Sequence, residues 1–184
     1  LLRNRGEGIF EDVTEAAGLL SFRATQTATW LDFDGDGWLD LFVGNESSPD
    51  DPQPCELFRN RRDGTFIEIA ALAGVGVTGL VKAVHSADFN NDGRPDLYLS
   101  CQDRENFLFR NDGPDPARPG SWRFSDVARP AGVESPTVSF PAWFFDYDQD
   151  GNPDLYVSSY GLLDPGAVAA DYLLKPLTAE RLAR

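Results

Sequence analysis

Short runs of apolar and β-branched residues, bounded by acidic or glycine-containing turns, recur along the chain. In the first third of the chain, four such runs occupy residues 26–33, 38–44, 56–60 and 65–70. Their length and their content of Val, Ile, Phe, Leu and Thr favour short β-strands over helices. Asp63 and Gly64 separate the last two runs and form a strong hairpin signal. The pattern therefore predicts four antiparallel strands that follow one another as a meander.

The same pattern occurs three times, which indicates an internal repeat. Asp32, Asp88 and Asp146 each open an acidic loop, so successive loops begin 56 and 58 residues apart. A glycine within Ala-Gly-Leu or Ala-Gly-Val lies 14 residues before each of these aspartates, and a phenylalanine lies eight residues before that glycine. Such constant spacing is typical of supersecondary modules that stack against their neighbours.

These observations predict an all-β fold, namely a partial β-propeller of about three four-stranded blade units. The expected segments are the outer strands of a preceding blade at 1–13, a blade at 26–70, a second blade at 82–127, and the inner strands of a further blade at 138–160. Residues 161–184 depart from the repeat. Asp164 followed by Pro165 is typical of a helix start, so a short helical insertion is expected there.

The composition supports a packed and acidic segment. Among 184 residues, 30 are acidic and 16 basic, the formal net charge is −14, and 12% are aromatic. This charge opposes binding to nucleic acid or to anionic membrane surfaces. The sequence has no uninterrupted apolar stretch of about eighteen residues, so it does not predict a membrane-spanning helix. The chain has no Met and begins inside a repeat motif, so we expect a processed or excised segment with any export signal upstream.

Each acidic loop places oxygen-bearing side chains at its positions 1, 3, 5 and 9, with glycine at position 6. Two carboxylates 4 Å apart repel by about 4 kcal/mol at an effective dielectric of 20. Ca²⁺ takes roughly 6–8 oxygen ligands and tolerates irregular loops better than Mg²⁺. The sequence therefore predicts about three calcium sites, with a backbone carbonyl from position 7. The expected ligands are Asp32, Asp34, Asp36, Trp38 and Asp40; Asp88, Asn90, Asp92, Arg94 and Asp96; and Asp146, Asp148, Asp150, Asn152 and Asp154.

The acidic loops have two other interpretations. An EF-hand needs a bidentate Glu at position 12 and flanking helices, but position 12 is Val43, Leu99 or Val157, and a strand-like run follows each loop glycine. Alternatively, the loops are ordinary Asp-Gly turns on an acidic surface. Three copies of one ligand pattern favour the metal site. The loop carboxylates also account for −11 of the net charge of −14.

The loops resemble the Asp-x-Asp-x-Asp-Gly-x-x-Asp motif of the FG-GAP/VCBS-type repeats of integrin-α-like β-propellers, with Asn90 at the second ligand of the middle loop. The flanking Leu-Phe-Arg-Asn, Asp-Gly-Thr-Phe and Ala-Gly-Val segments are similar, more narrowly, to the cartilage acidic protein/UnbV subgroup. The resemblance extends from residue 1 to about residue 160. It implies a seven-bladed parent, with calcium on the hairpins between the first and second strands of the blades.

The resemblance also implies a function. Its members suggest a secreted protein (extracellular, periplasmic or in the cell envelope) that binds a protein or glycan partner in recognition or adhesion, without catalysis. The remaining blades of the parent chain are the other expected partners. The alternative is a calcium-dependent extracellular enzyme acting on polysaccharide or lipid, with catalytic residues outside this segment. One His and no nucleophile elbow or phosphate-binding glycine loop favour the non-catalytic interpretation.

Several residues outside the loops have structural interpretations. His85 is expected to pack between blades rather than to act as a base. The recurrent Arg59 and Arg110 are expected to bind carbonyls or the acidic loops. Cys55 and Cys101 are predicted at the edge opposite the loops, where both a bridge between blades and free thiols remain open.

Overall fold

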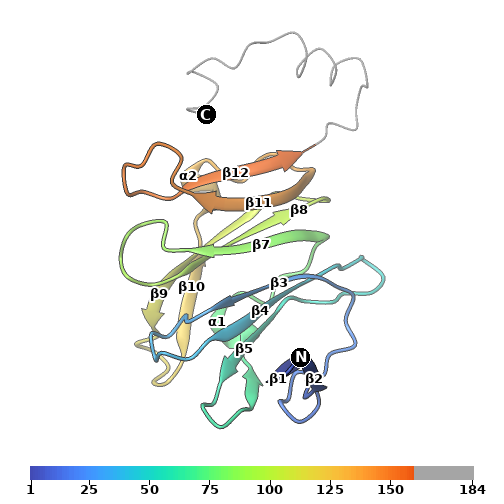
Figure 1. Cartoon of the computed structure of the whole chain (residues 1–184). Helices are drawn as coiled ribbons and strands as arrows, with labels where there is room; N and C mark the ends of the chain where they lie inside the picture. Colours follow the sequence, from blue (N-terminus) through green and yellow to red (C-terminus); the bar gives the residue numbers. More distant parts are fainter. Residues whose placement is uncertain (160–184) are drawn as a thin grey trace.

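The computed structural model describes residues 1–159, so the predicted helical insertion at 161–184 lies outside the described part of the chain. The described residues form antiparallel β-sheets and two short helices, which confirms the predicted all-β fold with propeller-like blades. The sheets are stacked in the order of the sequence (Figure 1).

Two four-stranded sheets with simple meander order form the centre of the structure. The first consists of β3 (Thr25–Leu31), β4 (Asp40–Asn45), β5 (Glu56–Asn60) and β6 (Phe66–Glu68). The second consists of β7 (Val81–Ala87), β8 (Asp96–Cys101), β9 (Phe107–Pro114) and β10 (Trp122–Asp126). The first strands of neighbouring sheets lie side by side, so β7 has β3 on one side and β11 (Ser139–Phe145) on the other.

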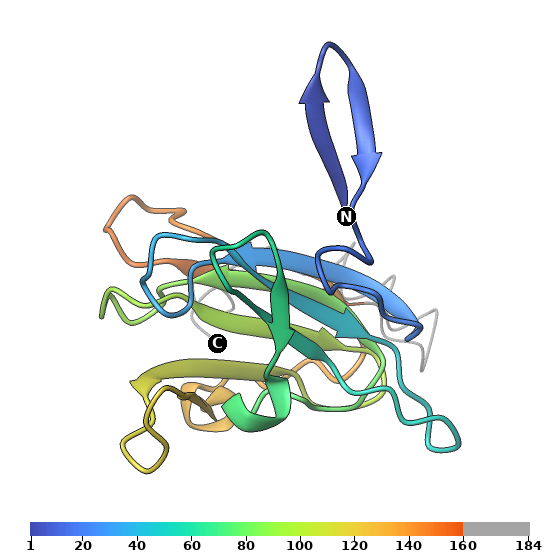
Figure 2. The same ribbon diagram turned by 90° about the horizontal axis from the view of Figure 1, so that it is seen from below.

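Two hairpins flank these sheets. β11 pairs with β12 (Asp154–Ser159) to form the third sheet, and β1 (Leu2–Gly6) pairs with β2 (Ile9–Asp12). Figure 2 shows the β1–β2 hairpin projecting away from the other sheets. Its side chains Leu2, Ile9 and Phe10 are 59–63% exposed. The hairpin therefore presents an apolar surface that no other part of the described chain covers.

The second strand of a blade is apolar on both faces because a neighbouring sheet packs on each side. In β8, Leu97 and Leu99 belong to the core shared with the first sheet, whereas Tyr98 belongs to the cluster shared with β11 and β12. Successive side chains of a strand point to opposite faces of the sheet. A strand covered on both faces therefore has a continuous apolar run instead of an alternating pattern.

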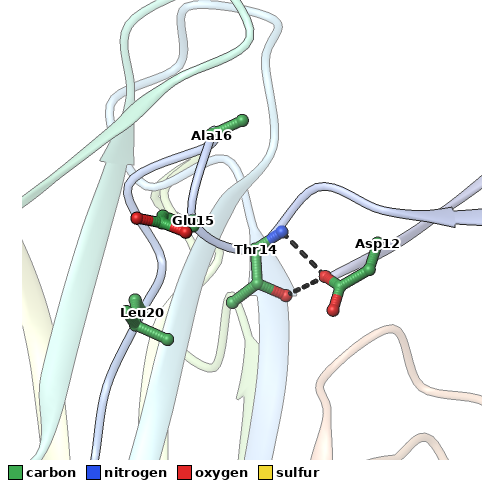
Figure 3. A pocket seen from close by; sticks show the side chains of 5 residues that line it. All are labelled: Asp12, Thr14, Glu15, Ala16 and Leu20. Carbon is green, nitrogen blue, oxygen red and sulfur yellow. Dashed lines mark hydrogen bonds between the residues drawn. The ribbon is translucent and has the colours of Figure 1, made fainter.

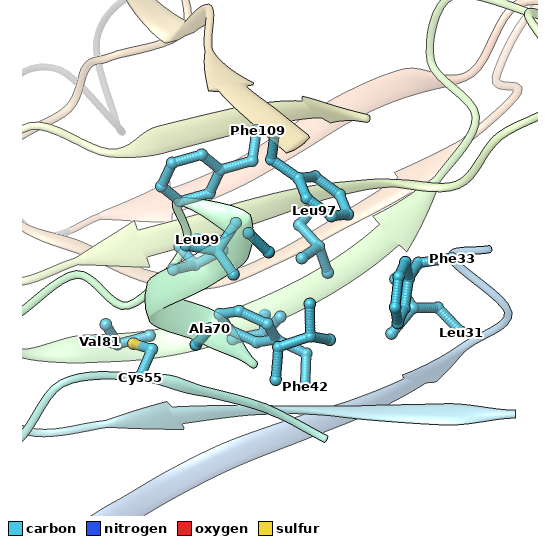
Figure 4. Packing of buried hydrophobic residues seen from close by; sticks show 14 of the residues in the cluster. Leu31, Phe33, Phe42, Cys55, Ala70, Val81, Leu97, Leu99 and Phe109 are labelled. Atoms are coloured by element: carbon cyan, nitrogen blue, oxygen red, sulfur yellow. The ribbon is translucent and has the colours of Figure 1, made fainter. Parts of the chain in front are cut away.

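The main core lies between the two four-stranded sheets (Figure 4). Phe42 and Leu57 come from the first sheet, and Leu97 and Leu99 from the second; all four side chains are fully buried. Complete burial of one such side chain stabilises the fold by about 1.5–3 kcal/mol. This apolar contact is what holds the two blades together.

A one-turn helix follows the last strand of each four-stranded sheet, and the sequence pattern does not predict either. α1 (Ala70–Ala73) and α2 (Ala128–Ala131) end at Gly74 and Gly132, whose φ angles of 83° and 71° are left-handed. Glycine adopts this conformation without steric cost. The turn directs Val75 into the core, where it is fully buried. The repeated Ala-Gly-Val segment is therefore the connection between blades.

Both cysteines are free thiols in this structure. Cys55 precedes β5 and Cys101 ends β8, and both are buried in the core between the two four-stranded sheets. Burial raises the pKa of the Cys101 thiol to about 12 and also raises that of Cys55. Both thiols are therefore protonated near neutral pH.

Phe33, the second residue of the first acidic loop, fixes this loop to the next sheet. Its side chain is 1% exposed, and its ring lies 5.9 Å from Trp122 and 6.2 Å from Phe124, between ring centroids. The side-chain amide of Asn111 donates a hydrogen bond of 2.8 Å to the carbonyl of Phe33. Tyr147, the corresponding residue of the third loop, is 60% exposed.

Phe33→Ala should lower the free energy of unfolding by about 3–5 kcal/mol, because it leaves a cavity between two sheets. Urea denaturation measures this loss. Phe22→Ala is the matched control, because Phe22 is 89% exposed and its truncation should change stability by no more than about 0.5 kcal/mol. Equal losses for both variants would contradict the packing role of Phe33.

Candidate metal centre

The aspartate at position 1 closes each acidic loop. In the first loop, Asp32 accepts hydrogen bonds from the backbone N–H groups of Asp36 (3.0 Å) and Gly37 (2.9 Å). Asp88 and Asp146 accept the same two bonds in their loops. The glycine at position 6 has a φ of 85–89° in all three loops, a conformation that disfavours other residues.

The aspartate at position 9 ties the loop to the third strand of its own sheet. Asp40 is fully buried and accepts hydrogen bonds from the backbone N–H groups of Phe33 (3.2 Å) and Asn60 (2.8 Å). Asp96 accepts the equivalent bonds from Phe89 (3.1 Å) and Asn111 (2.7 Å). The sequence pattern predicts position 9 only as a metal ligand and does not reveal this structural role.

Two of the loops bring three carboxylates together. One oxygen from each of Asp32, Asp34 and Asp40 lies within 4.8 Å of the other two, and the same is true of Asp146, Asp148 and Asp154. Two ligands of one calcium ion, each at roughly 2.3–2.6 Å from it, can be no further apart than about this distance. The donor set, consisting only of oxygen, therefore fits a hard divalent cation.

The middle loop differs from the other two. Its carboxylates Asp88, Asp92 and Asp96 do not form a third such group in the described chain. Asn90 takes the place that an aspartate has in the other loops, and its amide donates a hydrogen bond to Asp92 (2.9 Å). The middle loop thus has one negative charge fewer than its neighbours.

The position 5 aspartates stand outside the convergent groups. Asp36, Asp92 and Asp150 each accept a hydrogen bond from the backbone N–H of position 7, which is Trp38, Arg94 or Asn152. These bonds orient the turn of each loop. Ligation by the position 7 carbonyls stays a prediction.

Burial raises the pKa of Asp40 to about 7 and that of Asp96 to about 6. Desolvation is the main cause, and it outweighs the backbone hydrogen bonds that favour the charged form. The nearby carboxylates Asp34 and Asp36 raise the pKa of Asp40 further. A bound divalent cation would act in the opposite direction, because it stabilises the ionised carboxylates.

Arginine side chains contact the first loop, in agreement with the structural role expected for Arg59. The Arg59 guanidinium lies 2.6 Å from Asp34, whose side chain is fully buried, and 5.0 Å above the ring of Trp122 in the next sheet. Arg62 pairs with Asp36 at 2.8 Å. The equivalent of Arg59 in the second blade, Arg110, pairs instead with Asp112 at 2.7 Å.

His85 packs between the second and third sheets, as the sequence predicts. Its ring centroid lies 6.0 Å from that of Phe144, and its Nδ1 accepts a hydrogen bond from the backbone N–H of Phe144 (3.3 Å). Desolvation lowers the pKa of His85. A neutral, packed imidazole agrees with a structural role.

A pocket beside the N-terminal hairpin is lined by Asp12, Thr14, Glu15, Ala16 and Leu20 (Figure 3). The Asp12 carboxylate accepts hydrogen bonds from the backbone N–H (2.9 Å) and the hydroxyl (2.6 Å) of Thr14. These bonds complete a local turn. The pocket therefore offers no convergent set of free ligands comparable to the acidic loops.

The repeat pattern agrees with a known family. The sequence model of the FG-GAP-like repeat family matches residues 1–43, 32–99 and 88–157 of this chain. The chain belongs to the FG-GAP-like repeat family. The second and third matched ranges both begin at the first aspartate of an acidic loop and end within the strand that follows the next loop. Each of these two ranges therefore runs from one acidic loop to the next.

Two curated relatives are similar to this chain. Cartilage acidic protein 1 of Mus musculus is 30% identical over 149 residues, which cover 80% of this chain and 22% of the mouse protein. Cartilage acidic protein 1 of Xenopus tropicalis is 34% identical over 113 residues, which cover 60% of this chain and 16% of the frog protein. The chain thus spans about a fifth of the length of these relatives. Among its described residues, no helix is long and apolar enough to cross a membrane.

Asp40→Asn should change how stability depends on pH. In the unfolded chain Asp40 loses its proton near pH 3.8, but in the native protein only at about pH 7. Between these values the native state holds a proton that the unfolded state has lost, so raising the pH destabilises the wild type. Asparagine does not titrate. In chelator, the variant should therefore gain on the order of 2–3 kcal/mol relative to the wild type between about pH 5 and pH 8.

Thermal melts in chelator at several pH values measure this difference. Comparing two proteins removes the contribution of His85, whose lowered pKa changes stability in the opposite direction. Asp50→Asn, in an exposed loop, is the control and should show no relative change with pH. A constant difference between wild type and Asp40→Asn would contradict the assignment.

Proposed function

We propose that this chain is a calcium-stabilised segment of a β-propeller that recognises a protein or glycan, without a catalytic role of its own. The observation that carries the proposal is the convergence of Asp32, Asp34 and Asp40, and of Asp146, Asp148 and Asp154, within loops that backbone hydrogen bonds close. The Asp-rich pattern of the middle loop supports a third site. Calcium would relieve the repulsion between carboxylates that the fold itself brings together.

The remaining ligands follow from the loop pattern. In each loop the side chains of positions 1, 3, 5 and 9 would bind the ion together with the carbonyl of position 7. Position 5 would have to turn inward, because Asp36 and Asp92 are held by arginines. Membership of the FG-GAP-like repeat family supports a role in recognition.

The exposed faces of the segment support its place in a larger ring. Trp143 and Tyr156 stack at 4.6 Å on the face of the third sheet that points away from the second, and both are more than 40% exposed. We propose that further blades of the parent chain cover this face and the β1–β2 hairpin. On this proposal the blades at 26–70 and 82–127 are complete, and 138–160 holds only inner strands.

We also propose that the protein works outside the cytoplasm, in the extracellular space, the periplasm or the cell envelope. Calcium sites of extracellular modules have dissociation constants of about 10⁻⁴–10⁻³ M. Such sites are filled only where free calcium reaches the millimolar range. The name of the mouse and frog relatives, cartilage acidic protein 1, agrees with such a location.

Calcium should raise the melting temperature relative to chelator. At a free concentration of about 100 times the dissociation constant, each site adds roughly 2.7 kcal/mol, which is on the order of 5–10 °C for a chain of this size. Differential scanning calorimetry with calcium and with chelator measures the shift. Magnesium at equal concentration should have a smaller effect. Equal melting temperatures in calcium and chelator would exclude the metal site.

Asp148→Ala should lower the calcium stoichiometry by about one. Asp148 belongs to the convergent group of the third loop, so its loss removes a ligand. Asp50→Ala, on an exposed loop away from the group, is the matched control and should leave the stoichiometry unchanged. Isothermal titration calorimetry counts the sites, and an unchanged count in Asp148→Ala would contradict the assignment of this loop.

A further inference from the structure

The first loop carries its own positive charges. Arg59 lies 2.6 Å from Asp34, and Arg62 lies 2.8 Å from Asp36. Asp34 and Asp36 occupy positions 3 and 5, and their side chains are only 0% and 8% exposed. Two guanidinium groups thus neutralise half of the four carboxylates that calcium would require.

The two arginines differ in how firmly they are held. The Arg59 guanidinium packs over the ring of Trp122, 5.0 Å from its centroid, and its side chain is 31% exposed. Arg62 lies in the turn between β5 and β6, and its side chain is 54% exposed. Among the described residues, Asp36 is the only side chain that pairs with the Arg62 guanidinium. Arg62 can therefore leave the loop, whereas Arg59 is fixed by the next sheet.

The second loop shows that these contacts are not a general property of the repeat. Its position 3 is the neutral Asn90, and the equivalent of Arg59, Arg110, turns away to Asp112. The arginine that holds its position 5, Arg94, comes from the loop itself and pairs with Asp92 at 2.6 Å. Arg62 is thus a feature of the first blade, supplied by a turn some 26 residues away from Asp36 in sequence.

We propose that Arg62 competes with calcium for Asp36, so that the first loop takes up the cation only when Arg62 withdraws. This inference rests on the proposed function. Asp36 stands outside the convergent group, and it can turn its carboxylate toward the ion only if Oδ2 is released from the Arg62 guanidinium. Cation binding by Asp36 therefore competes with this ion pair. Arg62 stands in the β5–β6 turn, where its φ of 64° is left-handed. Calcium at the first loop is thereby linked to the outer edge of the blade.

Arg62→Gln removes this competitor and should raise the affinity of the first loop for the cation about tenfold, the equivalent of one charge-assisted hydrogen bond. Arg61→Gln is the matched control, because Arg61 is the neighbouring exposed arginine and contacts none of the loop aspartates in the described chain. Its affinity should stay within about twofold of the wild type. Melting in chelator checks that both variants fold.

A luminescent lanthanide gives a signal that is specific to the first loop. Only this loop has a Trp, Trp38, at position 7, where Arg94 and Asn152 stand in the others. Excitation of this indole should sensitise Tb³⁺ bound beside it. The signal of the first loop is the difference between each protein and the same protein carrying Trp38→Phe. Displacement of Tb³⁺ by Ca²⁺ then yields the calcium affinity of this loop.

The outcomes separate this inference from the proposed function. Equal first-loop affinities in Arg62→Gln and Arg61→Gln, or no Trp38-dependent signal in either, would overturn the role of Arg62 while calcium binding at the other loops stands. No lanthanide signal and no heat of calcium binding in any variant would overturn the proposed function, and this inference with it.

Discussion

The structure depends on a buried carboxylate that two backbone N–H groups hold in place. Asp40 and Asp96 each join the start of an acidic loop to the third strand of the same sheet. Without these bonds, one buried and one partly buried N–H donor in each blade would lack a partner, and the loss at the buried donor would cost about 1–3 kcal/mol. The carboxylates themselves are desolvated, which raises their pKa. Burial thus disfavours the ionised form of these carboxylates, and a cation bound at the same loop would offset this desolvation penalty.

The first acidic loop packs against the next blade, and this contact fixes the loop's shape. Phe33 comes directly after the first loop aspartate, yet its side chain lies against Trp122 and Phe124 of the next sheet. Asn111 adds a hydrogen bond from that sheet to the carbonyl of Phe33. The loop is therefore shared between two blades, and its shape is set by both. This explains how an exposed, highly charged segment keeps a defined conformation.

Much of this could be read from the sequence, because the period of the repeat is strict. Spacing located the loops and the strands, and the short apolar runs with turn signals between them predicted the meander. The double role of Asp40 could not be read, since it depends on Asn60, which comes next to the loop only after the chain has reversed between β4 and β5. The helix at Ala70–Ala73 is too short to show a helical period. The pairing of Arg62 with Asp36 depends on a left-handed turn residue that carries no sequence signal of its own.

The two buried thiols have a consequence for how the segment reacts chemically. Cys55 and Cys101 lie in the contact between neighbouring sheets and are protonated near neutral pH, and alkylating reagents attack the thiolate of an accessible cysteine. Neither residue can be modified while the blades stay together. The rate at which the native protein is alkylated consequently measures how often the two sheets separate. It detects opening events that are too rare to be seen in melting curves.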